Sequence, residues 1–171
     1  MNSQRIDRRN LALIFSGVLL VGVVPLLLTL LAILLDSLLQ FPPIILFPFN
    51  MGIAIPILII GFFWGIWSNL DLYREGKGSP IPTKSTETII LVESGPYKYC
   101  RNPMIFGYVL IFVGLGAFVN SLSLLIIIAP LILILLILYV KLIEEKALEA
   151  RFGEAYVAYK RKKSFIIPWF S

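Results

Sequence analysis

The sequence predicts an all-α membrane protein: a polytopic helical bundle of about four transmembrane helices, with the N and C termini on the cytoplasmic side. Three observations support this fold class. The chain of 171 residues is 58% hydrophobic and only 15% charged, whereas roughly 25% of residues are charged in a typical globular domain. Its apolar residues gather in four long stretches. Its 15 lysine and arginine residues lie only outside these stretches.

Each of the four stretches has the composition of a membrane span, which needs about 20 mostly apolar residues. The first is interrupted only by Pro25, and the third is the shortest. Only the pair Asn120-Ser121 separates the third from the fourth, which predicts a tight helical hairpin. The predicted spans are residues 11–35, 51–70, 103–119 and 122–140.

The orientation follows from the distribution of basic residues, which favour the cytoplasmic side of a membrane. Three precede the first span, five lie in the loop 71–102 and seven lie in the segment 141–171. The connections 36–50 and 120–121 contain none. A four-span chain therefore places every basic residue on one face, and we expect one membrane domain over residues 1–171, with 71–102 and 141–171 in the cytoplasm.

The composition excludes several kinds of chemistry. There is no histidine, the commonest metal ligand and the usual general base near neutral pH. The one cysteine, Cys100, cannot form an internal disulfide, and a zinc site built from a single cysteine and no histidine is not expected. We therefore expect no metal, and no nucleic-acid partner either.

The start of the third span predicts an anion site. Asn102 is a favourable N-cap and Pro103 suits the first helical position. Free backbone N–H groups and the positive end of the helix dipole would then lie beside Arg101, an arrangement that suits an anion. In the alternative interpretation, Arg101 pairs with a lipid phosphate, and Tyr97 and Tyr99 belong to the interfacial aromatic belt.

The fourth span predicts a carboxylate near the membrane boundary. The helix is expected to continue to Phe152 and end at Gly153. Glu144 begins an i, i+4 stripe on the apolar side, and carboxylates at such depth usually face a cavity or a partner. An ion pair with Arg101 or Lys141 is the alternative. The stripe comprises Glu144, Leu148, Phe152 and Tyr156, with Glu145 and Glu149 lying around the helix from it.

The two charged clusters together suit a zwitterion such as S-adenosylmethionine. This molecule carries a carboxylate, an ammonium group, a ribose diol and a sulfonium. Arginine and backbone N–H groups suit the carboxylate, glutamates suit the ammonium and the diol, and aromatic faces suit the sulfonium.

Two blocks of residues resemble the isoprenylcysteine carboxyl methyltransferase and phospholipid methyltransferase superfamily. The first runs from Leu91 to Gly107 and contains the sequence Arg101-Asn102-Pro103-Met104. The second runs from Glu144 to Tyr159. A helical hairpin separates the two, and Ile167-Pro168 follows them.

This resemblance implies a cytoplasm-facing cofactor pocket, built by the last membrane helices, the loop before them and the C-terminal segment. It implies an S-adenosylmethionine-dependent membrane methyltransferase that acts on a lipid-like or isoprenoid acceptor. We assign catalytic roles to Arg101 and Glu144. The implied cofactor-binding residues are Tyr97, Arg101, Asn102, Pro103, Met104, Glu144 and Glu145.

The sequence departs from this family at two positions. Asn102 stands where many members have histidine, and it keeps a hydrogen-bonding side chain. Ile105 stands where a tyrosine is usual, so any contact of that hydroxyl group is absent.

Two other functions remain open. An NADPH-dependent membrane reductase of the sterol-reductase type should show more basic residues for a 2′-phosphate, and the Glu144-Glu145 pair argues against it. The second alternative is a non-enzymatic membrane protein with the same scaffold. For the methyltransferase, a prenylated thioether carboxylate and an amine-headed phospholipid both fit as acceptor, and membrane lipids are the expected partners. The tail, with Arg161, Lys162 and Lys163 followed by Phe165 to Phe170, would hold it on an anionic membrane surface.

Overall fold

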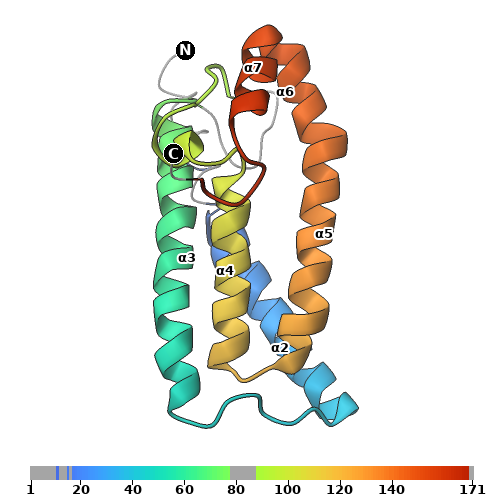
Figure 1. Ribbon diagram of the computed structural model, residues 1–171. Coiled ribbons are helices and arrows are strands. Elements are labelled where there is room, and N and C mark those ends of the chain that lie inside the picture. Colours follow the sequence, from blue (N-terminus) through green and yellow to red (C-terminus); the bar gives the residue numbers. More distant parts are fainter. Residues whose placement is uncertain (1–10, 12–14, 16, 78–87, 170–171) are drawn as a thin grey trace.

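A computed structural model describes residues 17–77 and 88–169, together with Leu11 and Phe15. All named elements in this part of the chain are helical, which confirms the predicted all-α class. The long helices lie alongside one another and their connections gather at the two ends (Figure 1). In order, the elements are η1 (Val18–Val23), α2 (Val24–Leu39), α3 (Phe49–Arg74), η2 (Gly95–Lys98), α4 (Pro103–Phe118), η3 (Leu124–Ile128), α5 (Ala129–Tyr139), η4 (Val140–Glu144), α6 (Glu145–Phe152) and α7 (Glu154–Lys162).

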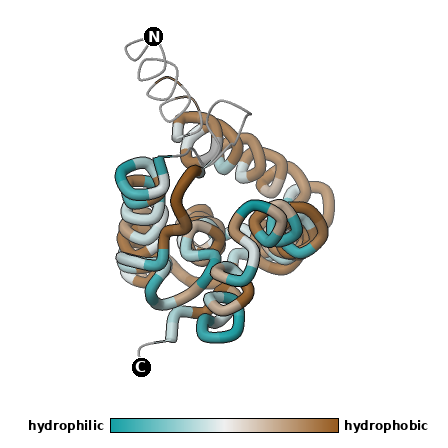
Figure 2. The backbone as a smooth tube through the Cα atoms, turned by 90° about the horizontal axis from the view of Figure 1, so that it is seen from above, coloured by the Kyte–Doolittle hydropathy of each residue, from teal (hydrophilic) through white to brown (hydrophobic). Residues whose placement is uncertain are grey.

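Three helical stretches are long and apolar enough to cross a membrane: Val21–Leu39, Phe49–Arg74 and Leu124–Phe152. They correspond to the first, second and fourth predicted spans, although each is displaced or extended. Helix α4 is also apolar but has only 16 residues, so it rises about 24 Å, less than the roughly 30 Å of a hydrocarbon core. The view down the bundle shows mainly hydrophobic residues along α2 (Figure 2).

Helices α3 and α4 pack with their backbones in contact. A Cβ atom added at Gly107 would lie 2.7 Å from the amide nitrogen of Gly65 and 2.8 Å from the carbonyl oxygen of Gly61. A Cβ at Gly61 would lie 2.9 Å from the amide nitrogen of Ile111. Small residues allow helices to approach this closely. Gly65, at this contact, also lines the cavity described below.

The end of the bundle away from α6 and α7 is closed by side chains that bind backbone groups. The Asn120 amide accepts hydrogen bonds from the N–H groups of Ile44 and Ile45 and donates one to the carbonyl of Ile45. The Asp36 carboxylate accepts a hydrogen bond of 2.8 Å from the N–H of Ser123, at the start of the last long helix. These contacts join α2 and the α2–α3 connection to the α4–η3 connection.

Candidate functional site

A cavity of about 420 Å³ lies at the end of the bundle that carries α6 and α7. Its walls come from α3, α4, the long helix from α5 to α6, helix α7 and the loop that ends at Asn102. Helices α3 and α4 each contribute residues at i, i+4 and i+7, the spacing of one helical face. From α3 these residues are Gly65, Asn69 and Leu72; from α4 they are Met104, Tyr108 and Ile111.

The start of α4 leaves backbone donors open to this cavity. Asn102 is the N-cap residue and Pro103 is the first helical residue, as predicted. The Asn102 side chain makes no capping hydrogen bond, however; its Nδ2 donates instead to the carbonyl of Phe165 at 2.9 Å. The first backbone N–H groups of α4 belong to Met104 and Ile105, and both residues line the cavity. This helix start has the donors and the dipole end that bind anions.

Arg101 lies beside that helix start, and contacts with other side chains fix the position of its guanidinium. Its Nη1 donates to Oε1 of Glu145 at 2.5 Å, and Oε2 of Glu145 lies 2.6 Å from Nζ of Lys160. The Arg101 guanidinium also lies 5.2 Å from the centre of the Phe165 ring. Its Nε is buried and has no hydrogen-bond partner among the described residues. Arg101 therefore lines the cavity with an unused donor.

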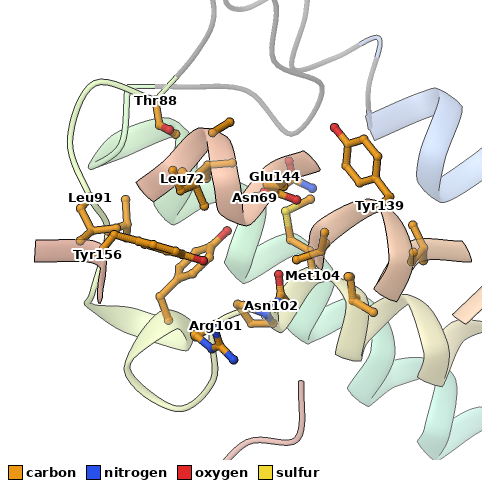
Figure 3. A pocket seen from close by; sticks show the side chains of 18 of the residues that line it. Asn69, Leu72, Thr88, Leu91, Arg101, Asn102, Met104, Tyr139, Glu144 and Tyr156 are labelled. Carbon is orange, nitrogen blue, oxygen red and sulfur yellow. The ribbon is translucent and has the colours of Figure 1, made fainter. Parts of the chain in front are cut away.

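The structure places Glu144 and Glu145 differently. Glu144 lines the cavity, and Figure 3 shows it with Asn69 and Met104 around the same space. Glu145 is buried and is not among the lining residues. Instead of facing a ligand, Glu145 contacts Arg101 and Lys160 and so fixes the position of the guanidinium.

The alternative partners considered for Glu144 are engaged elsewhere. Arg101 pairs with Glu145, and Nζ of Lys141 lies 5.2 Å from the centre of the Phe165 ring. Glu144 has no ion-pair partner within the part of the chain that the structure describes. It lies in η4, a π-helical turn, and such turns often occur at functional sites.

The residues of the predicted stripe from Glu144 all line the cavity, but they do not lie on one continuous helix. Helix α6 ends at Phe152 as expected, and Gly153 adopts φ 56° and ψ −134°. The chain turns there and restarts as α7, which brings Tyr156 back to the cavity wall. Leu148 and Phe152 line the wall as well.

Three tyrosines form the aromatic part of the wall. Tyr97, Tyr156 and Tyr159 are all buried, and the Tyr159 hydroxyl donates to the carbonyl of Tyr97 at 2.7 Å. Burial, together with the Glu145 carboxylate, raises the pKa of Tyr156 to about 12. Its hydroxyl group therefore remains protonated at neutral pH.

The C-terminal segment holds the loop in place through a parallel bridge. The N–H of Arg101 donates to the carbonyl of Ser164 at 2.9 Å, and the N–H of Asn102 donates to that of Phe165 at 3.2 Å. Further along, the N–H of Trp169 donates to the carbonyl of Tyr99. The backbone around Arg101 is thus tied to a segment more than sixty positions later in the chain.

Sequence reasoning brought together Tyr97, Arg101, Asn102, Pro103, Met104 and Glu144, and all six line this cavity. It did not identify Asn69, Tyr108 or Tyr139, which also line it. Asn69 could have been noticed as a polar residue near the end of an apolar span, since such residues usually face a cavity. Tyr108 and Tyr139 have no such signal, because aromatic residues are common in membrane helices. Among the described residues, no group of His, Cys, Asp or Glu side chains could hold a metal ion.

Comparison with known protein families gives a match over much of the chain. Residues 49–155 match the model of the family described as phospholipid methyltransferase. The matched range begins at α3 and ends at the second residue of α7, so it contains the cavity-lining residues of α3, α4 and the long helix from α5 to α6. Val21 and the α7 residues Tyr156 and Tyr159 lie outside it. No curated protein and no solved structure matches the chain.

Proposed function

This chain belongs to the phospholipid methyltransferase family, and from this premise we propose that it transfers a methyl group from S-adenosylmethionine to a lipid-like acceptor at the cytoplasmic face of the membrane. The family implies a membrane methyltransferase that acts on lipid-like substrates. The cofactor, the membrane face and the roles of individual residues are our proposals.

One observation carries the choice of cofactor: the cavity combines unused donors at one position with a free carboxylate at another. We infer that a carboxylate group would bind the Arg101 side chain, whose Nε has no hydrogen-bond partner among the described residues, and the first N–H groups of α4. Such charge-assisted hydrogen bonds are stronger than neutral ones. Glu144 is available for an ammonium group or a ribose diol, because it has no ion-pair partner among the described residues.

The remaining walls also suit this cofactor. The rings of Tyr97, Tyr156 and Tyr159 line the cavity, and the faces of aromatic rings attract cations such as a sulfonium. A volume of about 420 Å³ is within the usual range of roughly 300–1,000 Å³ for a small-molecule site. The residues present therefore fit S-adenosylmethionine in charge, in hydrogen bonding and in size.

When bound, S-adenosylmethionine supplies a methyl group on a sulfonium: an acceptor lone pair forms the new bond as the carbon–sulfur bond breaks, leaving its electron pair on sulfur. The residues of this chain bind and orient the reactants and exclude water, which is the main contribution a protein can make to such a displacement. Arg101 and Glu144 would fix the two ends of the amino-acid group, so the absence of histidine is no obstacle.

The membrane location rests on two findings. Three long apolar helices and membership of this family fit an integral membrane protein. We further propose a chain that crosses the membrane several times, with the cavity facing the cytoplasm, because all basic residues of a four-span chain would then lie on that side.

A ligand-binding experiment tests the proposed cofactor. S-adenosylmethionine or S-adenosylhomocysteine should raise the melting temperature of the purified protein in detergent, because a ligand that binds only the folded state stabilises it. NADPH at the same concentration is the control. A shift with NADPH and none with the two sulfur compounds would move the assignment to the membrane reductases.

A further inference from the structure

We propose that the C-terminal segment (residues 164–169) binds the anionic surface of the membrane in which the protein lies, and that this contact orders the cavity wall at Arg101. Two features carry the inference. The segment combines exposed apolar side chains with exposed cations, and its backbone is hydrogen-bonded to the backbone at Arg101. The inference rests on the membrane location of the protein and is independent of which ligand the cavity binds.

The C-terminal segment exposes two large apolar side chains. Ile167 is 72% exposed and Trp169 is 71% exposed. Neither residue belongs to a helix, so neither is part of the apolar surface of the long membrane-spanning stretches. Exposed apolar residues that lie close together mark a contact with a membrane or with another protein. Tryptophan in particular is enriched at the boundary between a membrane and water.

Hydrogen bonds place the segment at the level of the start of α4. The N–H of Trp169 donates to the carbonyl of Tyr99 at 3.1 Å, and the carbonyl of Ser164 accepts from the N–H of Arg101. Figure 1 shows the segment, coloured dark red, leaving α7 and passing the start of α4. Helix α4 begins at Pro103, where we expect the hydrocarbon core of the membrane to begin. The exposed side chains can therefore reach the lipid interface.

Exposed cations precede the segment at the end of α7. Arg161 and Lys162 are both exposed, and neither forms an ion pair with another described residue. The negative end of the helix dipole favours cations here, but it does not account for the exposure of Ile167 and Trp169. Basic residues beside apolar ones are the combination that binds an anionic membrane surface. This charge selects anionic lipid as the partner.

The binding of the segment to lipid does not need a high intrinsic affinity. Its partner is the membrane that holds the rest of the chain, so the effective concentration of lipid at the segment is high. Each lysine or arginine close to an anionic surface contributes about fivefold to binding. Two cations and two apolar side chains are thus sufficient for the segment to be bound most of the time.

The same segment supplies hydrogen-bond acceptors to the cavity wall. The carbonyls of Ser164 and Phe165 accept from the N–H groups of Arg101 and Asn102, and Nδ2 of Asn102 also donates to the Phe165 carbonyl. The Phe165 ring lies 5.2 Å from the Arg101 guanidinium and 5.2 Å from Nζ of Lys141. Arg101 and Asn102 line the cavity. Contacts that fix the segment therefore also fix this part of the wall.

The membrane contact should act by suppressing local opening. The segment belongs to no helix, so its order depends on the few hydrogen bonds that it makes with the loop before α4. Segments with few such contacts open more readily than the core of a protein. A lipid surface that binds only the closed position shifts the equilibrium toward it.

Hydrogen exchange of the protein in nanodiscs tests this coupling. Nanodiscs of phosphatidylcholine alone are compared with nanodiscs that also contain phosphatidylglycerol. Exchange at the N–H groups of Arg101 and Asn102 should slow at least about fivefold in the anionic lipid, the effect of one cation at such a surface. The N–H of Ser123, which Asp36 binds at the other end of the bundle, should exchange equally in both. Equal exchange at Arg101 and Asn102 in the two lipids would overturn the inference.

Two pairs of substitutions with the same loss of charge separate the segment from a general effect of positive charge. Arg161→Gln with Lys162→Gln should abolish the difference between the two lipids. Lys77→Gln with Lys146→Gln, at exposed positions after α3 and on α6, should preserve it. Loss of the difference in both double variants would overturn the assignment to this segment. Slow exchange that requires two protein copies per nanodisc, whatever the lipid, would assign the surface to a second copy instead.

Fluorescence quenching tests the membrane contact directly. Lipids brominated on their acyl chains should quench Trp169, whose signal is obtained by subtracting the emission of Trp169→Phe from that of the wild type. Quenching should be stronger in the anionic nanodiscs and should decline at high salt, because salt screens the attraction between exposed charges. An unquenched Trp169 would overturn the membrane contact. Both measurements use the protein without a ligand, so failure to bind S-adenosylhomocysteine would contradict the proposed function and leave this inference standing.

Discussion

Arg101 and Glu145 join two distant parts of the chain, with 2.5 Å between Nη1 of the arginine and Oε1 of the glutamate. Only 12% of the Arg101 side chain and 6% of the Glu145 side chain are exposed. The pair connects the loop before α4 to the first turn of α6, and Lys160 of α7 completes it. The guanidinium is thereby held at the cavity wall.

Glu145→Gln should lower both stability and cofactor affinity. The substitution leaves two cations without their shared carboxylate, and breaking a buried ion pair on one side typically destabilises a protein by about 3–5 kcal/mol. Thermal unfolding in detergent and titration with S-adenosylhomocysteine would measure the two effects. Glu149→Gln is the matched control: Glu149 also contacts Lys160, but both side chains are more than a third exposed, and such pairs contribute about 0–1 kcal/mol.

Glu144→Gln should weaken binding of the cofactor and leave the melting temperature of the free protein nearly unchanged. A lost charge-assisted hydrogen bond reduces affinity about 10- to 150-fold. Glu144 makes no ion pair with another described residue, so the substitution removes no ion pair that stabilises the fold. Calorimetric titration beside Glu154→Gln, an exposed residue outside the cavity, would measure the difference. Reduced stability with unchanged affinity would instead indicate a structural role.

Gly107→Ala should destabilise the bundle by about 1–3 kcal/mol, as expected for an overpacked interface. The added methyl group would lie 2.7 Å from a backbone nitrogen of α3, which cannot move away alone. Gly52→Ala provides the control, because nothing lies within 4 Å of its added Cβ. There, the better helix propensity of alanine should leave stability unchanged or raise it slightly. Equal melting temperatures for the two variants would contradict the close packing of α3 and α4.

The Cys100 thiol should react slowly with maleimide in the native protein. It should also make the free energy of unfolding fall as the pH rises above 9. Its side chain is fully buried, and burial raises the pKa of the thiol from 9.0 to about 12. Between these two values the unfolded state loses the proton first, so this contribution to stability is present below pH 9 and is lost as the pH rises toward 12. The melting temperature of Cys100→Ala, measured against pH beside the wild type, should therefore decline less over that range. Rapid labelling of the native thiol at pH 7 would contradict the burial.

Single cysteines should reveal the proposed orientation. In a Cys100→Ala background, a membrane-impermeant maleimide added to intact cells should label Ser37→Cys and should not label Lys162→Cys. Both positions are exposed and lie at opposite ends of the bundle. Labelling of Lys162→Cys from outside would reverse the proposed orientation.

Much of the fold follows from local sequence. The apolar stretches are long enough to predict the helices, and Pro103 and Gly153 mark a helix start and a helix end, where the structure has them. Boundaries were less predictable. The second long helix, α3, continues past Leu70 to Arg74, because the end of apolar composition does not require the end of backbone hydrogen bonding.

The candidate site was only partly predictable for a geometric reason. Glu144 and Glu145 are neighbours in sequence, and both were expected at the cofactor. Successive residues point about 100° apart around a helix, so one faces the cavity while the other reaches Arg101. Which of them does so depends on how the last long helix packs and on its π-helical turn at Val140–Glu144.

The sequence by itself determined the all-α membrane class and the loop and helix that supply the charged residues of the cavity. These are local properties, because hydropathy, charge and helix-terminal residues act over one or two turns. Only the tertiary structure placed Asn69 and Tyr108 on the same cavity. They come from helices whose approach depends on glycine contacts and on a C-terminal segment that binds the loop from far along the chain.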